Sequence, residues 1–406
     1  AAAGYDCIVS GTAPCAAATS TSVALTVNTA PSISAQPVAQ IACSNPGTAS
    51  YTITAAGTGL TYQWRLNGVN LVDGANVSGS NTATLNLTNL TSANTAATAS
   101  GYDCVVTGAG SCAVTSTRVA LTVNTVPSIG TQPTDQTACS TPGTASFTVA
   151  AAGTGLTYQW RLNGVNLVNG VQGNGSTVSG ATTNTLSLST LTTANTVAAA
   201  AGYDCIVSGT APCAAATSTR VALTVNTTPS ISSQPVAQTA CSTPGTASFT
   251  ITAAGTGLTY QWRLNGVNLV DGANVAGSTT ATLSLSNLTS ANTVIATSGY
   301  DCVVSGAAPC AAVTSTRVAL TVNTVPSIST QPVAQTACST PGTASFTVAA
   351  AGTGLTYQWR LNGVNLVNGT NIAGATTATL SLSSLTSANT VAAAAGYDCI
   401  VSGTAP

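Results

Sequence analysis

The chain has 406 residues, of which only 4% are charged: seven Arg and eight Asp, with no Lys, Glu, His or Met, for a formal net charge of −1. Seven Arg spread over this length cannot neutralise a track of phosphates, which excludes nucleic-acid binding through a basic stripe. The absence of His, Glu and Lys removes the usual general acids and bases, so we expect no enzyme, and no uninterrupted apolar run approaches the ~20 residues of a membrane span.

The chain repeats itself at intervals of 97 to 101 residues. The motif Gly-Tyr-Asp-Cys occurs five times, the first copy beginning at Gly4. The motif Tyr-Gln-Trp-Arg occurs four times, the first copy containing Trp64. A period of this length is that of a whole small domain. We therefore predict three complete domains at 30–125, 126–227 and 228–324, preceded by the last part of a domain at 1–29 and followed by a domain lacking its last strand at 325–406.

The two ends of the sequence share a segment, because residues 1–14 are identical to residues 393–406. One interpretation is a window cut from a longer array that continues as the same repeat chain. The other is head-to-tail assembly, in which residues 15–28 supply the missing strand to the last domain of another subunit. The redundant copy of the preceding strand in residues 1–11 counts against the second interpretation.

The first complete repeat alternates short apolar–polar runs with turn signals, and no helical period extends over a useful length. Asn67-Gly68 is a strong signal for a type I′ hairpin turn, and Pro37 interrupts the first strand as is typical of an edge. About seven strands follow from this pattern. Six of them are placed at 31–41, 49–55, 60–66, 84–90, 102–107 and 117–123, with short connections between them.

A central Trp64, a Leu-x-Leu strand after it, and Tyr102 two residues before Cys104 resemble the immunoglobulin-like pattern. The sequence of the repeats is similar to that of tandem bacterial Ig-like repeats in large secreted surface or adhesin proteins of Bacteroidota-type bacteria. The resemblance covers essentially the whole chain and implies an all-β tandem array of Ig-like sandwiches. It departs where Ile53 replaces the second-strand Cys, so the usual inter-sheet disulfide cannot form. The structural core is expected around Trp64, Trp160, Trp262, Trp359, Tyr102, Tyr203 and Tyr300.

Thirteen Cys are placed regularly, three in each full repeat, which suggests an oxidising, extracellular setting. The Cys on the sixth strand faces Ile53 across the core, and Cys104, Cys205 and Cys302 are therefore expected to be free buried thiols. The other two Cys of each repeat lie at opposite poles of a sandwich, and such poles meet at a junction between domains. We predict inter-domain disulfides Cys43–Cys213 and Cys139–Cys310. Pairing inside a domain, as Cys43–Cys112 or Cys104–Cys112, and simple packing of buried thiols stay open as alternatives.

The few charges recur at fixed places in the repeat. Trp64 and Cys104 point inward, so their neighbours Arg65 and Asp103 point outward, and Arg118 lies on the adjoining strand. A cross-strand ion cluster that sets register is the expected role, and a ligand-binding pair of Arg is the alternative.

The sequence contains no arrangement of residues that is typical of a catalytic or metal-binding site. A Ser or Cys nucleophile would have no His or Lys as its base, and Asp73, Asp135 and Asp271 each stand alone, unlike the clustered ligands of a calcium site. No catalytic residue, metal or cofactor is predicted. The first hypothesis is a segment of an extracellular filament or surface stalk that associates with its own kind. The alternatives are an adhesin that grips a glycan or a protein through its loops, and a spacer of a secreted enzyme; nearly identical loops in successive repeats favour the structural role.

Overall fold

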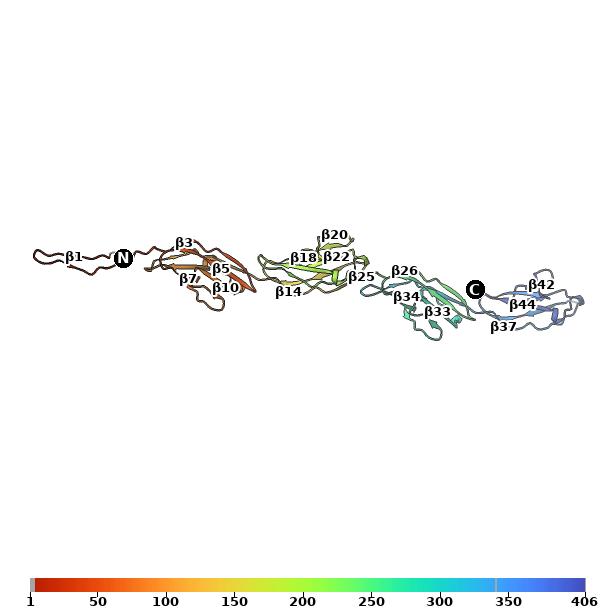
Figure 1. Cartoon of the computed structure of the whole chain (residues 1–406). Helices are drawn as coiled ribbons and strands as arrows, with labels where there is room; N and C mark the ends of the chain where they lie inside the picture. The colour runs from red at the N-terminus through yellow and green to blue at the C-terminus, as the bar shows by residue number, and fades with distance from the viewer. Residues whose placement is uncertain (1–3, 340–341, 406) are drawn as a thin grey trace. The chain divides into compact units, whose positions relative to one another are not determined.

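The computed structural model describes residues 4–339 and 342–405. The chain divides into two compact units, one made of Ala1–Gln136, Ala145–Ser189 and Val197–Leu223, the other of Thr137–Thr144, Thr190–Thr196 and Thr224–Pro406. The fold is all β, a tandem array of Ig-like sandwiches (Figure 1). Because the two units do not follow the predicted domain boundaries, those boundaries stay a prediction, and the repeats are numbered here by sequence alone.

The first complete repeat forms two main sheets and two accessory pairs. One sheet has the order β5-β10-β9 and the other β12-β11-β7-β8, while β3 pairs with β6 and β4 pairs with β13. The strands are β3 (Ser32–Ala35), β4 (Gln40–Cys43), β5 (Gly47–Thr52), β6 (Thr54–Ala56), β7 (Thr61–Leu66), β8 (Val69–Asn70), β9 (Val77–Ser78), β10 (Thr84–Leu90), β11 (Tyr102–Thr107), β12 (Ala113–Thr115) and β13 (Leu121–Asn124).

Alternation explains why these segments are strands. In β10, Leu85 and Leu87 are buried and Asn86 between them is exposed, so one face covers the core. Asn67 and Gly68 have φ values of 50° and 78°, the left-handed conformation that a type I′ turn requires between β7 and β8. A Cβ atom on Gly101 would lie 2.0 Å from the carbonyl oxygen of Val119, so the start of β11 needs glycine for this close approach.

The end of the repeat differs from the predicted hairpin of 102–107 with 117–123. On the side of β11 away from β7, its antiparallel partner is β12, and only a single bridge joins Tyr102 to Val119. Beyond that bridge, β13 turns to pair in parallel with β4, with Leu121 beside Gln40. The predicted strand 49–55 is likewise divided at Ile53 into β5 and β6, since β6 pairs with β3 instead of β10.

The second and third repeats follow largely the same order, and the Ala/Thr/Ser stretches contain short 3₁₀ turns that were not predicted. The second repeat contains β14 (Ser128–Thr131), β15 (Gln136–Cys139), β16 (Ala145–Thr148), β17 (Ala150–Ala152), β18 (Thr157–Leu162), β19 (Val165–Asn166), β20 (Gly170–Val171), β21 (Thr177–Ser179), β22 (Thr185–Ser189), β23 (Tyr203–Ser208), β24 (Ala216–Thr217) and β25 (Leu223–Asn226). The third contains β26 (Ser230–Ser233), β27 (Gln238–Cys241), β28 (Ala247–Thr250), β29 (Thr252–Ala254), β30 (Thr259–Leu264), β31 (Val267–Asn268), β32 (Val275–Ala276), β33 (Thr282–Leu285), β34 (Tyr300–Ser305), β35 (Val313–Thr314) and β36 (Leu320–Asn323).

The fourth repeat contains β37 (Ser327–Thr330), β38 (Ala344–Thr347), β39 (Ala349–Ala351), β40 (Thr356–Leu361), β41 (Val364–Asn365), β42 (Ile372–Ala373), β43 (Thr379–Leu382) and β44 (Tyr397–Ser402), and the chain opens with a hairpin of β1 (Ile8–Val9) and β2 (Ala18–Thr19). The 3₁₀ turns are η1 (Ser92–Asn94), η2 (Thr98–Ser100), η3 (Thr193–Asn195), η4 (Ala199–Ala201), η5 (Ser290–Asn292), η6 (Ala296–Ser298), η7 (Ser387–Asn389) and η8 (Ala393–Ala395). Within the described residues, no helix is long and apolar enough to cross a membrane.

Each repeat has its own core around a tryptophan. Trp64 is fully buried, and its indole Nε1 donates to the carbonyl oxygen of Thr82 at 2.9 Å, which satisfies the polar atom of the ring. Tyr51 stacks on Tyr102 with ring centroids 5.0 Å apart, and the third repeat repeats this pair as Phe249 on Tyr300. The tryptophans Trp64, Trp160, Trp262 and Trp359 and the tyrosines Tyr102, Tyr203 and Tyr300 are all buried.

Candidate functional sites: bridged junctions and buried aspartates

Two disulfides join successive repeats. Cys43, at the end of β4, is bonded to Cys213, with Cα atoms 5.4 Å apart, inside the first unit. Cys139 is bonded to Cys310 with the same Cα separation inside the second unit. The structure thus brings together both pairs proposed for the junctions, and Cys104 and Cys112 take part in neither bond.

Hydrogen bonds surround the Cys43–Cys213 bridge. The backbone N–H of Ser44 donates to the carbonyl oxygen of Asn124 at 2.8 Å, and the Asn124 side chain donates to the carbonyl oxygen of Ala211 at 3.3 Å. The Ser44 hydroxyl accepts from the N–H of Val126 at 3.3 Å. A polar connection between two sandwiches is thereby satisfied internally, so the chain passes from one repeat to the next without a flexible linker.

The same contacts recur around Cys139–Cys310. The Asn226 side chain donates to the carbonyl oxygen of Ala308 at 3.1 Å, and the N–H of Thr228 donates to the Ser140 hydroxyl at 3.2 Å. In the sequence this place carries a recurring Asn-Thr-x-Pro motif, as at residues 124–127 and 226–229. The role of its Asn was missed, although a buried Asn at a strand end is a residue that needs partners for its amide.

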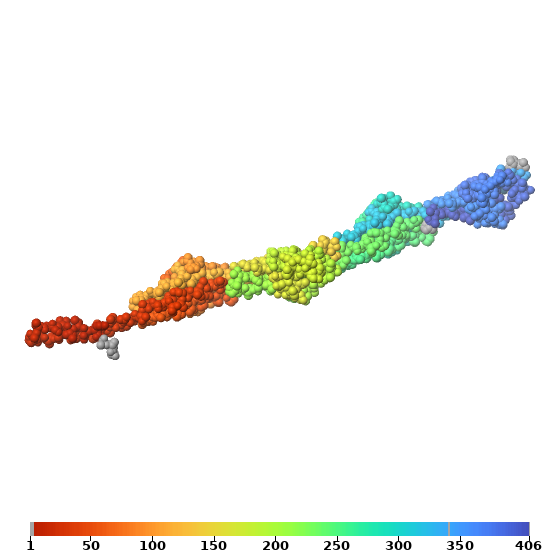
Figure 2. All heavy atoms as spheres, turned by 90° about the horizontal axis from the view of Figure 1, so that it is seen from above, coloured from red at the N-terminus to blue at the C-terminus, as the bar shows by residue number. Residues whose placement is uncertain are grey.

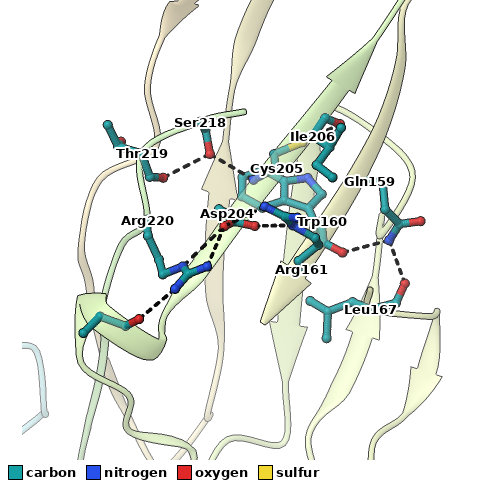
Figure 3. A network of polar contacts seen from close by, with 11 residues as sticks. Gln159, Trp160, Arg161, Leu167, Asp204, Cys205, Ile206, Ser218, Thr219 and Arg220 are labelled. Carbon is teal, nitrogen blue, oxygen red and sulfur yellow. Dashed lines mark hydrogen bonds and ion pairs between the residues drawn. The ribbon is translucent and has the colours of Figure 1, made fainter. Parts of the chain in front are cut away.

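Each complete repeat also holds an aspartate between two arginines, and Figure 3 shows Arg161 and Arg220 converging on Asp204. Arg161 Nε and Nη2 donate to the two carboxylate oxygens of Asp204 at 2.7 and 3.0 Å. Arg220 adds contacts to Oδ2 at 3.3 Å, and its Nη1 donates to the carbonyl oxygen of Ala200 at 2.8 Å. The 3₁₀ turn before β23 therefore supplies a second acceptor that fixes the arginine.

The predicted trio of the first repeat has the same arrangement. Arg65 Nε lies 2.7 Å from Asp103 Oδ1, and Arg118 Nη2 lies 3.1 Å from Oδ2. The register of β7 and β11 places Arg65 directly opposite Asp103. Asp103 is on the outer face, as expected, yet its side chain is only 4% exposed, because the two arginines lie across it. The cluster is therefore a buried carboxylate and not a solvated surface pair.

The thiols on β11, β23 and β34 are enclosed. Cys104, Cys205 and Cys302 are fully buried, and burial raises the pKa of each to about 11. Because the thiolate is the reactive form, these groups are chemically quiet at neutral pH. In Figure 3 the N–H of Cys205 donates to the Ser218 hydroxyl, at 2.9 Å, which ties β23 to the segment that follows it.

Of the aspartates that stand alone in the sequence, Asp73 and Asp271 serve local turns, and Asp135 joins two segments that are distant in the chain. Asp73 Oδ1 accepts from the N–H of Ser80 at 2.8 Å, and Asp135 Oδ1 accepts from the N–H of Ala222 at 2.7 Å. Hydrogen bonds from Ser278 lower the pKa of Asp271, whose Oδ1 accepts from that N–H at 2.7 Å. Among the described residues, no group of three or more His, Cys, Asp or Glu side chains could hold a metal ion.

Comparison with known proteins places the chain by its fold alone. No family model and no curated protein matches it. It is similar to the I-band fragment I67–I69 from titin, at 14% identity and a TM-score of 0.50, over 72% of this chain and 98% of that one. A mutated variant of the same three Ig domains gives 13% identity, a TM-score of 0.50, and coverage of 72% and 99%. At such identities the likeness shows the tandem Ig-like fold and nothing about partners.

Proposed function

We propose that the chain is a structural segment of an extracellular filament or surface stalk, in which joined Ig-like sandwiches resist bending and extension. The observation that carries the proposal is the pair of disulfides between successive repeats, Cys43–Cys213 and Cys139–Cys310. Hydrogen bonds from Asn124 and Asn226 reinforce the same junctions. A protein that needed freely moving domains would have no use for such covalent links.

The bridges also limit how far the chain can be stretched. They close loops of 170 and 171 residues, and the loops overlap between Cys139 and Cys213. A force along the chain passes through both bridges, so a sandwich that unfolds inside a loop releases little length. This is a useful property for a tether and has no evident role in an enzyme.

The setting and the partners follow from the same features. Structural disulfides persist in oxidising compartments, which supports a location outside the cell. The sequence resemblance to bacterial surface repeats supports a bacterial source. Gly-Thr-Gly-Leu-Thr-Tyr-Gln-Trp is unchanged in all four repeats, which favours a spacer or polymer over an adhesin with specialised loops. The partner is then the same kind of chain, and neither a nucleic acid nor a cofactor is required.

Single-molecule pulling of the full chain tests this role. Reduction of both bridges should lengthen the fully unfolded chain by on the order of several hundred Å, since an extended residue spans ~3.4 Å. A Cys43→Ser/Cys139→Ser chain should behave like the reduced protein without any reductant, and Cys7→Ser, at an exposed thiol, should not. Equal lengths with and without reductant would contradict the mechanical role. Antibody labelling of intact producing cells, with no permeabilisation, checks the location.

A further inference from the structure

Each repeat has an edge strand that nothing blocks. The sheet of the first repeat has the order β12-β11-β7-β8, so β8 lies at its edge, and β19 and β31 take the same place in the second and third repeats. The N–H of Leu71 points toward β7, where it donates to the carbonyl oxygen of Trp64 at 2.9 Å. The backbone groups of Asn70 and Val72 therefore point to the free edge. Residues 65–73 contain neither Lys nor Pro, the residues that commonly protect such an edge.

Two valines beside this edge are exposed. Val69 and Val72 are 70% and 79% exposed, and both positions are valine in all four repeats. Strand propensity alone does not explain this choice, because Thr suits a strand equally well and the chain uses it at other outward positions such as Thr52. The exposed Val38, by contrast, has Thr134 as its counterpart in the second repeat. The edge thus keeps apolar surface in contact with water.

A positive and a negative charge accompany these valines. The cluster of Arg65, Arg118 and Asp103 contains two positive charges and one negative, which leaves a net charge of +1. The fourth charged residue of that repeat is Asp73, directly after the second valine. Asp73 is exposed, and hydrogen bonds from Ser80 lower its pKa, so it is ionised at neutral pH. Among the described residues its carboxylate takes part in no ion pair.

The repeats carry two kinds of this hairpin. Residues 65–73 and 263–271 are identical, and we call them the charged hairpins. The second and fourth repeats have Asn169 and Asn368 in place of the carboxylate, and we call residues 161–169 and 360–368 the neutral hairpins. In Figure 2 the orange part of the first repeat, where the colour bar places residues 65–73, stands out from the rest of that repeat.

We propose that the charged hairpins bind a second copy of this chain edge to edge, about a two-fold axis. The inference rests on the proposed function and names a contact between its chains. In this arrangement β8 of one copy pairs antiparallel with β8 of the other through the backbone groups of Asn70 and Val72. The valines of both copies leave water, and the arginine cluster of each copy faces Asp73 of the other.

Charge complementarity is the reason for choosing a second copy as the occupant. The hairpin presents a net positive cluster and an unpaired carboxylate on either side of apolar surface, so a two-fold axis brings each charge to its opposite. The first repeat, residues 30–125, contains two Arg and two Asp, and its net charge is therefore zero. Two such surfaces meet without an excess of like charge, and no other molecule is needed to supply the counter-charges.

The two kinds of hairpin would decide which repeats meet. Two charged hairpins make two ion contacts, a charged and a neutral one make a single contact, and two neutral ones make none. Such contacts are weak at a surface, and one pair of hairpins is smaller than the roughly 1,200 Å² of a stable interface. Where both charged hairpins of a chain engage, each raises the effective concentration of the other. We therefore expect a specific association that salt weakens.

Sedimentation of the full chain over a concentration series tests the contact. We expect oligomers that grow with concentration at an ionic strength of about 0.02 M and shrink at about 0.5 M. Asp73→Asn/Asp271→Asn should weaken the association roughly fivefold or more, because every charged hairpin becomes neutral. The substitution should not disturb the fold, because Asn169 already serves this turn by accepting from the N–H of Ala181 at 2.9 Å.

The matched control removes the same charge outside the hairpins. Asp6→Asn/Asp135→Asn should leave the association unchanged. Asn169→Asp/Asn368→Asp should strengthen it, because the neutral hairpins then carry the carboxylate. A monomer at every concentration overturns the proposal, and so does an equal loss in the two variants that remove aspartates.

The valines have a test of their own. Val72→Thr/Val270→Thr keeps a β-branched side chain of the same shape and replaces a methyl group by a hydroxyl. The association should weaken several-fold and keep its dependence on salt, because apolar contact is lost while the charges stay. An association as strong as that of the original chain would overturn the edge contact.

Photo-cross-linking between light and ¹⁵N-labelled chains locates the contact. A benzoylphenylalanine placed at Val69 reacts with whatever lies beside the edge. After trypsin cleavage the hairpin valines are in peptides 66–118, 162–220, 264–317 and 361–406. Links between a light and a heavy chain should join 66–118 to 66–118 or 264–317 in preference to 162–220. Links mainly to 119–161 or 221–263 would overturn the proposed surface.

Single-chain pulling separates this proposal from the proposed function. A chain that lengthens on reduction yet stays monomeric would refute the edge contact and leave the stalk function standing. A chain that associates through the charged hairpins, but whose length does not respond to reductant, would refute the mechanical role and leave the contact standing.

Discussion

The third and fourth repeats have nearly the same sequence but differ in how they bury it. In the third, β36 covers the core, and Asp301 is held by Arg263 and Arg317 with its side chain 3% exposed. In the fourth, no described strand covers that side. Asp398 forms an ion pair with Arg360, and its side chain is 55% exposed. The carboxylate is thus buried by the last strand and not by its own β-strand.

The tryptophan half of the core does not share this dependence. Trp359 is fully buried in the fourth repeat, as Trp262 is in the third, and its Nε1 donates to Thr377 at 2.9 Å. Cys399, directly opposite Trp359 on the neighbouring strand β44, and Tyr397 on the same strand are only half-buried. Each sandwich therefore has one part that its own early strands close, and another that the last strand of the repeat covers.

The largest difference in stability between the third and fourth repeats is expected when the arginine that follows the core tryptophan is removed. Arg263→Ala should cost about 3 kcal/mol, the lower end of the range for a broken buried pair, because Arg317 still contacts Asp301. Arg360→Ala should have a far smaller effect, because Asp398 is already hydrated. Urea unfolding followed by hydrogen exchange in β30 and β40 measures both. Equal losses in the two repeats would show that the last strand does not set the environment of the carboxylate.

The second-largest difference between the two repeats is expected in the rate at which their buried and half-buried thiols are alkylated. Burial raises the pKa of Cys302 to about 11, and it also raises that of the half-buried Cys399. Iodoacetamide at pH 8 should modify Cys399 roughly tenfold or more faster than Cys302, because its sulfur is within reach of solvent. Mass analysis of peptides 264–317 and 361–406 reads the two rates.

The smallest difference between the two repeats is expected when the pH is lowered. Hydrogen bonds from Ser278 lower the pKa of Asp271, so the stabilisation that they give is present above the unfolded-state value and is lost as pH falls through the folded-state pKa. In the fourth repeat Asn368 makes the matching contact, accepting from Ala375 at 2.8 Å, and an amide does not titrate. Amide exchange at Ser278, corrected for its intrinsic pH dependence, should speed up below about pH 4. Exchange at Ala375 should not, and Asp271→Asn should abolish the difference.

The strand positions were largely readable from the sequence. The ranges expected for 84–90 and 102–107 coincide with β10 and β11, because alternation and turn residues act over neighbouring positions. The pattern failed at 117–123, where the chain leaves β11 and pairs in parallel with β4. A parallel partner some eighty residues away has no local signature. The 3₁₀ turns at Ser92–Asn94 and Thr98–Ser100 were also missed, although Thr91 and Asn94 cap each other in the first of them.

The site residues divide in the same way. The Arg–Asp–Arg trio could be anticipated because side-chain alternation and strand order place its members on one face. The burial of Asp103, the carbonyl contact of Arg118 with Ala99 at 2.7 Å, and the buried Asn124 at the junction could not, because each depends on what the neighbouring segments cover.

By itself the sequence determined an all-β tandem Ig-like array, its period and the choice of residues that form each core, since these depend on local alternation and on repetition. Only the tertiary structure decided that the aspartates between paired arginines are shielded from water and that Asn124 is buried at a junction. The physical reason is that burial belongs to the segment that covers a residue, and that segment lies far away in the chain.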